Sequence, residues 1–452
     1  MKKKSIILVL IIIFLLCFLG INNKNNKEEP IINTNKLIGT IISISNNKIT
    51  IQDKNNIIYS FNKDFPKSTI GTKVEITYDG ILNKNQENQN INIKEINIVP
   101  ITKNEDNIPN EWLDDGILSK YYSKAYNKIK NMTIEEKIGQ LLLVRYPNDN
   151  QIEIAINNNL GGYIFFEKDF INKTENEVKE MINSIQEKAK IPLLTAVDEE
   201  GGRVVRISSN KNLVSERFKS SRVLYLTGGF ELIKEDTINK SNILSNLGIN
   251  VNLAPVVDIS TNENDYMYYR TIGEDAKTTS EYAKTVINAS KKGNVSYVLK
   301  HFPGYGNNVD THNNTAIDNR SYESILNNDL KPFKSGINAN AEAVLVSHNI
   351  VTSIDNKNIA SLSPGIHNLL RNELNFTGII ITDDLYMDAA SKIENASLKA
   401  ILSGNDLIIT TNYEKSINEI KKALDNNEID ESLINKLALR NIAWKYYKGL
   451  IK

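Results

Sequence analysis

Eight short apolar runs rich in β-branched residues recur through residues 117–452 of this 452-residue chain, and they constrain its fold more than any other feature. Amphipathic segments lie between most of the runs, for example at 175–187, 278–291 and 413–424. Apolar strands that alternate with helices predict a parallel sheet covered by helices. Eight such units predict an α/β fold of the (β/α)8 TIM-barrel type. The predicted strands are residues 141–144, 163–166, 192–197, 251–257, 296–299, 343–346, 378–381 and 406–409.

An open, doubly wound sheet is the competing architecture for this pattern. That fold usually carries a G-x-G-x-x-G phosphate-binding turn after its first strand. No such motif follows residues 141–144, so the sequence favours the barrel. Thr133 and Glu136 have the spacing of a capping box, which predicts that a helix begins just after Thr133.

A different periodicity precedes the barrel. Residues 37–100 alternate apolar and polar side chains in short runs separated by Asn- and Gly-containing turns, which predicts a small all-β domain. This domain contains no His and no catalytic constellation, so a spacer or wall-binding role is favoured. A flexible tether is expected at 22–36 and a polar linker at 101–116.

The leading segment has the pattern of an export signal. Three lysines precede an unbroken apolar run over 6–21, which reaches roughly 24 Å as a helix at about 1.5 Å per residue. No small-residue cleavage site follows the run. Residues 1–21 are therefore expected to be a signal peptide or, preferably, an uncleaved membrane anchor. Either one places the rest of the chain outside the cytoplasm.

Composition excludes several kinds of protein. Lys plus Arg and Asp plus Glu both number 54, and this zero net charge argues against a nucleic-acid binder. The one cysteine, Cys17, lies in the leading apolar run, so the folded part has neither a disulfide nor a thiolate metal site. The His residues are spread over separate predicted loops, and no metal is expected.

Ionisable residues follow the ends of the predicted strands, where a (β/α)8 barrel builds its active site. These residues are Asp198 and Arg206 after the third run, Arg270 after the fourth, Lys300, His301, Asp310 and His312 after the fifth, and Asp383 and Asp384 after the seventh. His348 follows the sixth run and is assigned either to the site or to its support. Arg203 is expected to form a structural ion pair.

These residue types suit one reaction. A carboxylate beside cations stays ionised and can act as a nucleophile. Asp383 and Asp384 both qualify, but neighbours in an extended chain point to opposite sides, so only one faces the barrel mouth. Asp310 and His312 share a face if their segment is extended, and an Asp–imidazole pair can transfer protons near neutral pH. A carboxylate nucleophile and a proton donor are the equipment of retaining glycoside cleavage.

Four motifs, in this order, resemble those of glycoside hydrolase family 3. They are Asp198-x-Glu-Gly-Gly-Arg-x-x-Arg206, Lys300-His301-Phe-Pro-Gly-x-Gly, Asp310-x-His312 and Ile-Thr-Asp383-Asp384-Leu-x-Met. The most similar branch is the β-N-acetylhexosaminidases that trim peptidoglycan fragments. The resemblance implies a barrel without a cofactor and a covalent glycosyl-aspartate intermediate.

The resemblance also implies roles for single residues. Asp383 is similar to the nucleophile, and His312 with Asp310 is similar to the acid/base dyad. The positions that bind the non-reducing sugar are matched by Asp198, Arg206, Arg270, Lys300 and His301. The expected substrate is a GlcNAc-containing muropeptide or chitooligosaccharide, with the membrane as a further partner through residues 1–21 and no nucleic acid.

Three alternatives stay open. The chain could be a family 3 β-glucosidase or β-xylosidase. It could be a β-N-acetylglucosaminide phosphorylase, in which phosphate takes the place of water. It could also be a non-catalytic cell-wall-binding protein that has kept the barrel.

Overall fold

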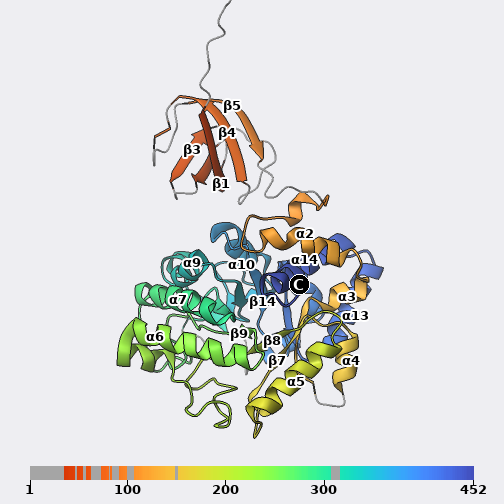
Figure 1. Ribbon diagram of the computed structural model, residues 1–452. Helices are drawn as coiled ribbons and strands as arrows, with labels where there is room; N and C mark the ends of the chain where they lie inside the picture. The colour runs from red at the N-terminus through yellow and green to blue at the C-terminus, as the bar shows by residue number, and fades with distance from the viewer. Residues whose placement is uncertain are drawn as a thin grey trace, which may run out of the picture. The chain divides into compact units, whose positions relative to one another are not determined.

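The computed structural model of the chain describes residues 35–45, 48–53, 57–62, 73–80, 82–83, 91–98, 106–147, 151–306 and 316–452 (Figure 1). The chain divides into two compact units, Met1–Val99 and Pro100–Lys452, and each is described by itself. The predicted signal or anchor at 1–21 lies outside the described residues, as does the tether at 22–36 apart from Asn35 and Lys36. In the part of the chain that is described, no helix combines the length and the apolarity that a membrane crossing requires.

The first unit contains a five-stranded antiparallel sheet with the strand order β3-β2-β1-β4-β5, as the period-two pattern predicts. Ile41, Ile49, Ile51, Val74 and Ile76 are at most 1% exposed and form one apolar cluster with aromatic neighbours. The strands are β1 (Asn35–Ser45), β2 (Lys48–Asp53), β3 (Ile58–Asn62), β4 (Lys73–Asp79) and β5 (Asn92–Ile98).

The second unit is the predicted barrel of eight parallel strands. The order is β14-β12-β10-β9-β8-β7-β6-β15, and a parallel bridge between Ile381 and Leu407 joins the two end strands. The strands are β6 (Leu142–Arg145), β7 (Gly162–Phe165), β8 (Leu194–Val197), β9 (Val251–Asn252), β10 (Ser296–Phe302), β12 (Ala343–Val346), β14 (Ile379–Thr382) and β15 (Ile408–Thr410). A separate pair is formed by β11 (Ile317–Asp318) and β13 (Ile350–Val351).

Helices surround these strands (Figure 1). The α-helices are α2 (Tyr122–Ile129), α3 (Ile134–Gly139), α4 (Ile152–Asn157), α5 (Glu175–Lys188), α6 (Ser221–Asn246), α7 (Ala276–Ser290), α8 (Tyr322–Asn327), α9 (Leu330–Asn338), α10 (Pro364–Asn368), α11 (Asp388–Ser391), α12 (Ala396–Ser403), α13 (Tyr413–Asp425) and α14 (Glu431–Tyr447). The short 3-10 helices are η1 (Asn110–Trp112), η2 (Ser119–Tyr121), η4 (Glu167–Asp169), η5 (Lys291–Gly293) and η6 (Ala360–Leu362). The element η7 (Leu369–Glu373) is a short π-helix.

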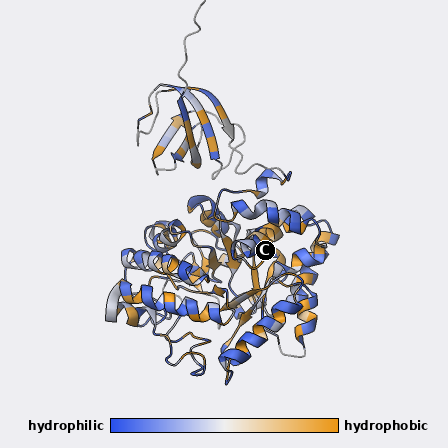
Figure 2. Cartoon of the chain, in the orientation of Figure 1, coloured by the Kyte–Doolittle hydropathy of each residue, from blue (hydrophilic) through white to orange (hydrophobic). Residues whose placement is uncertain are grey.

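Hydrophobic residues, in orange, predominate on the central strands, whereas the surrounding helices carry both hydrophilic and hydrophobic residues (Figure 2). The predicted capping box is present: Thr133 Oγ1 accepts from the Glu136 amide at 3.3 Å, and Glu136 Oε2 accepts from the Thr133 amide at 3.0 Å. Within the predicted run 251–257 the regular strand β9 ends at Asn252, because the Ala254 amide donates to Asn252 O at 2.8 Å instead of to a neighbouring strand. Val256 then forms an isolated parallel bridge with Lys300.

Part of the expected linker packs on the barrel. The sequence predicts a linker at 101–116, but Trp112, in the described part of this range, is 7% exposed and belongs to the barrel core. Asp114 accepts from Arg440 of α14 at 2.6 Å, and Arg440 also donates to Asp406, just before β15, at 2.8 Å. A pattern of polar residues could not reveal this contact, because it depends on a helix more than 300 positions away.

A buried lysine lies beside the start of β6, the first strand of the barrel. Lys445 of α14 is fully buried, and its Nζ donates to Gln140 Oε1 at 2.6 Å. Burial lowers the pKa of Lys445 to about 7. The folded protein therefore releases this proton at a lower pH than the unfolded chain, in which a lysine titrates near pH 10.

We predict that Lys445→Met flattens the pH dependence of stability. Between about pH 7 and pH 10 the unfolded chain binds more protons than the folded one, so this lysine makes the unfolding free energy rise with pH, by up to about 1.4 kcal/mol per pH unit. Urea unfolding at several pH values measures the slope. The exposed control Lys422→Met should keep the wild-type slope, and an unchanged slope in Lys445→Met would contradict the prediction.

Candidate active site

Charged side chains from several strand ends meet at one end of the barrel. Lys300 in β10 is the centre of this group, because its Nζ lies 2.8 Å from Asp198 Oδ1 and 2.7 Å from Glu200 Oε1. Arg270, from the loop after β9, donates to Glu200 from Nε at 3.0 Å and from Nη2 at 2.7 Å. Arg206 Nη2 lies 3.3 Å from Asp198 Oδ2. We call these five residues the carboxylate–cation cluster.

Burial and charge set the protonation of the cluster. Burial disfavours the ionised form of Asp198, but the charges of Lys300 and Arg206 outweigh it and lower the pKa of Asp198. Burial also opposes ionisation of Glu200, whose pKa Arg270 and Lys300 hold well below its usual range. Against its own burial, Lys300 has its pKa raised by the two carboxylates. The cluster therefore stays charged across the neutral pH range.

The sequence prediction did not include Glu200, although its spacing from Asp198 indicates that the two carboxylates lie on the same side of the chain. Asp198 and Glu200 are two positions apart after β8, so in extended chain they share a face. Glu199 points the other way and is fully buried. Its carboxylate accepts from the amides of Arg206 at 2.7 Å and Ile207 at 2.6 Å and from the Ser208 hydroxyl at 2.5 Å. Glu199 thus fixes the loop that carries Arg206.

His301 is oriented by a buried aspartate. Asp258 is 1% exposed, and its Oδ2 lies 2.8 Å from His301 Nδ1 and 3.1 Å from the His301 amide. Asp258 Oδ1 accepts from the Tyr305 amide at 2.6 Å. With Nδ1 donating to this carboxylate, Nε2 is left to accept, and Arg270 Nη2 lies 3.4 Å from it. His301 thereby contacts the carboxylate–cation cluster through Arg270.

The β14 loop carries the predicted nucleophile. The Asp383 amide donates to Val346 O of β12 at 2.9 Å, and Asp383 Oδ1 accepts from the Asp384 amide at 2.8 Å. The Asp384 carboxylate is directed elsewhere: its Oδ2 lies 2.8 Å from Arg145 Nε and 2.6 Å from Arg145 Nη2, at the end of β6. The two neighbouring aspartates therefore have different partners.

Both carboxylate oxygens and the carbonyl oxygen of Asp384 accept hydrogen bonds. In addition to Arg145, its Oδ1 accepts from the Tyr386 amide at 2.9 Å. Its carbonyl oxygen accepts from Nε2 of the buried His348 at 3.0 Å, and His348 Nδ1 lies 2.7 Å from Ser361 Oγ. Since a carbonyl oxygen only accepts, Nε2 carries the proton of His348. His348 therefore supports the loop rather than acting from within the site.

The other residues singled out in the sequence lie in different surroundings or outside the described ranges. Asp310 and His312 lie outside the described residues. Arg203 is exposed, and its guanidinium lies 4.0 Å from the ring centroid of Tyr269; among the described residues it forms none of the expected ion pairs. His367 is buried in α10, where Nδ1 contacts Ser363 O at 2.8 Å. Across the described ranges, no group of three or more His, Cys, Asp and Glu side chains is arranged to hold a metal ion.

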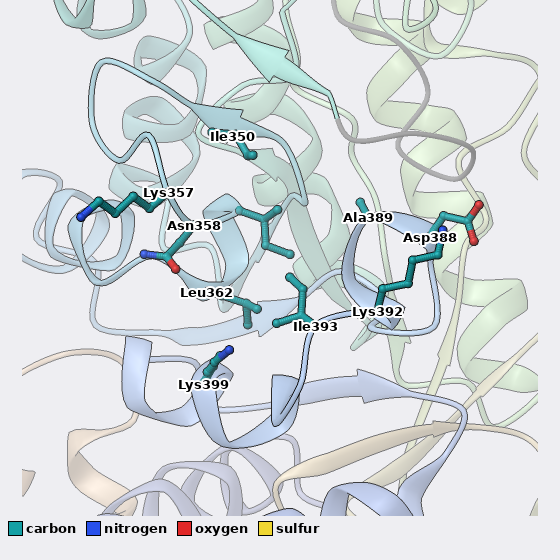
Figure 3. Close-up of a pocket in the computed structure, with 10 residues that line it drawn as sticks. Ile350, Lys357, Asn358, Leu362, Asp388, Ala389, Lys392, Ile393 and Lys399 are labelled. Atoms are coloured by element: carbon teal, nitrogen blue, oxygen red, sulfur yellow. The ribbon is translucent and has the colours of Figure 1, made fainter.

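A separate hollow of about 510 Å³ lies beside α11 (Figure 3). Lys357, Lys392 and Lys399 line it together with apolar side chains such as Ile350 and Ile393. None of its lining residues belongs to the carboxylate–cation cluster or is Asp383. The hollow is therefore distinct from the candidate active site.

Known proteins resemble this chain in sequence and in fold. The family model described as the N terminal domain of glycosyl hydrolase family 3 matches residues 133–443. The Beta-hexosaminidase of Haemophilus influenzae is 29% identical over 287 residues, which are 62% of this chain and 80% of that protein.

Solved structures are similar as well. A glycoside hydrolase family 3 beta-N-acetylglucosaminidase from Paenibacillus sp. str. FPU-7 superposes with a TM-score of 0.66 and 27% identity, covering 71% of this chain and 63% of that chain. M tuberculosis LpqI gives a TM-score of 0.64 and 25% identity, covering 70% of this chain and 95% of that one.

We predict that Lys300→Met lowers the unfolding free energy by about 3 kcal/mol at pH 7, because Asp198 and Glu200 stay buried with less positive charge beside them. In the variant the carboxyl pKa values rise, so protonation between pH 7 and pH 5 relieves part of the cost. The deficit relative to wild type should therefore shrink toward pH 5 in chemical denaturation. A deficit that is equal at both pH values would contradict this, and the exposed Lys399→Met is the control.

Proposed function

Because this chain belongs to glycoside hydrolase family 3, we propose that it is a retaining exo-β-N-acetylglucosaminidase that removes terminal GlcNAc from peptidoglycan fragments. The observation that carries the proposal is the buried carboxylate–cation cluster at the barrel end where the Asp383 loop begins. The relatives named Beta-hexosaminidase and the Paenibacillus beta-N-acetylglucosaminidase support the choice of sugar.

The reaction proceeds in two displacements. A carboxylate oxygen of Asp383 attacks the anomeric carbon, the bond from that carbon to the glycosidic oxygen breaks, and His312, paired with Asp310, gives a proton to the departing oxygen. Water then gives a proton to His312 and attacks the same carbon, which releases the sugar and restores the Asp383 carboxylate. The roles of Asp310 and His312 rest on the motif resemblance.

The carboxylate–cation cluster holds the non-reducing sugar. Ionised Asp198 accepts hydrogen bonds from hydroxyl groups, and Arg206, Arg270 and Lys300 donate to hydroxyl oxygens. Because each carboxylate of the cluster is paired with two cations, the cluster can bind an uncharged sugar without leaving a buried carboxylate unpaired. The fixed geometry reduces the entropy lost when the sugar binds.

The cell-wall substrate and the location are part of the proposal. The lysines at 2–4 and the apolar run at 6–21 support action outside the cytoplasm, where such fragments form. Cell fractionation with an activity assay tests the location. Cleavage activity confined to the cytoplasm would contradict it.

We predict that the wild-type chain releases 4-nitrophenol from the β-GlcNAc glycoside faster than from the β-glucoside or β-xyloside. Asp383→Asn should lower kcat at least about 10³-fold with little change in folding, because an amide is a poor nucleophile. Faster cleavage of the glucoside or xyloside would overturn the sugar assignment, and a fully active Asp383→Asn would overturn the mechanism. Stimulation by phosphate, with formation of a sugar phosphate, would favour the phosphorylase alternative.

We predict a different signature for Asp384→Asn. This change weakens the bond to Arg145 while it preserves the shape of the β14 loop, so Asp383 loses precise placement. The expected result is a fall in kcat of about tenfold with KM for the 4-nitrophenyl substrate nearly unchanged. A rise in KM at constant kcat would instead assign Asp384 to ground-state sugar binding.

A further inference from the structure

The β14 loop presents an exposed aromatic ring close to the predicted nucleophile. Tyr386 is 61% exposed and lies three positions after Asp383. Its amide donates to Asp384 Oδ1 at 2.9 Å, so the backbone that carries the ring is fixed. The mechanism proposed above gives this ring no role.

The ring is one of two aromatic rings that lie beside the Arg145 guanidinium. The guanidinium of Arg145 lies 5.4 Å from the Tyr386 ring centroid and 4.8 Å from that of Phe166. Two N–H groups of Arg145 point at Asp384 Oδ2, at 2.8 and 2.6 Å, so its plane cannot rotate freely. We call Tyr386, Arg145 and Phe166 the aromatic platform. It is built from the ends of β6, β7 and β14.

The platform continues into the sugar-binding cluster. The Arg206 guanidinium lies 5.2 Å from the Phe166 ring centroid and also pairs with Asp198. One end of the platform therefore adjoins the grip on the non-reducing sugar, and the other adjoins the Asp383 loop. The carboxylate–cation cluster comes from β8, β10 and the loop after β9, which leaves the side formed by β6, β7 and β14 for the rest of the substrate.

We propose that the aromatic platform receives the leaving sugar, with its pyranose ring stacked on Tyr386. This rests on the proposed function and names its substrate class: glycosides whose leaving group is itself a sugar. The C–H face of a pyranose is apolar and is buried well by an aromatic ring, while the phenol and guanidinium can bond to hydroxyls at the edge. Because Asp384 balances the charge of Arg145, the platform suits an uncharged sugar as well as an acidic one.

Two substrates distinguish binding of the leaving sugar by Tyr386 from a role of Tyr386 in catalysis. Chitobiose has a GlcNAc leaving group, whereas N-acetyl-β-glucosaminyl fluoride has the same sugar to be transferred but no ring in its leaving group. Tyr386→Ala should lose about tenfold in kcat/KM on chitobiose and keep wild-type kcat/KM on the fluoride. Tyr386→Phe keeps the ring and should retain most of the chitobiose activity. Lys392→Ala, in the hollow of Figure 3, is the unaffected control.

Each other outcome overturns the proposal. Equal losses on both substrates would assign Tyr386 to the loop or to the transferred sugar, and no loss on chitobiose would mean that nothing stacks on it. A Tyr386→Phe variant as defective as Tyr386→Ala would exclude ring stacking. If the wild-type chain cleaves the fluoride but not chitobiose, the role of the platform is wrong and the proposed function stands. If it cleaves neither substrate, both the proposed function and the role of the platform are wrong.

Discussion

The two ion pairs of Lys300 join the end of β10 to the loop after β8, and the candidate site is built around them. An ammonium with only 3% of its side chain exposed is costly to bury, and it is stable here because the carboxylates of Asp198 and Glu200 both lie beside it. The same arrangement keeps Asp198 and Glu200 ionised. A sugar with several hydroxyls then meets fixed donors and acceptors instead of side chains that must first be ordered.

The β14 loop is held by different means. Arg145 of β6 fixes the Asp384 carboxylate, and His348, in the loop after β12, fixes its carbonyl oxygen. Side chains from the ends of β6 and β12 thus help to determine where Asp383 lies on the β14 loop. The division is clear in physical terms: one set of charges grips the substrate, and a second set positions the group that attacks it.

The barrel could be predicted because its strands are apolar on both faces and its helices on one, a pattern that local sequence carries completely. The same reasoning failed at β9, where the Ala254 amide bonds within the chain and interrupts the strand, and at residues 106–116, where Asp114 and Trp112 pack on the barrel. Glu200 was missed because its role depends on Arg270 and Lys300, which are 70 and 100 positions away. Asp383 follows β14, and Asp198, Arg206 and Arg270 follow β8 and β9, whereas Lys300 and His301 lie within β10. The roles of these residues, like those of Asp310 and His312, stay predictions.

The central claim is that the Asp383 carboxylate bonds covalently to the anomeric carbon. A 5-fluoro-N-acetylglucosaminyl fluoride slows the second displacement more than the first, so the glycosyl-enzyme should accumulate and survive proteolytic digestion. The account predicts that mass spectrometry finds one sugar per chain, attached to the peptide that contains Asp383, and specifically to that side chain. Stoichiometric label on any other residue would contradict it.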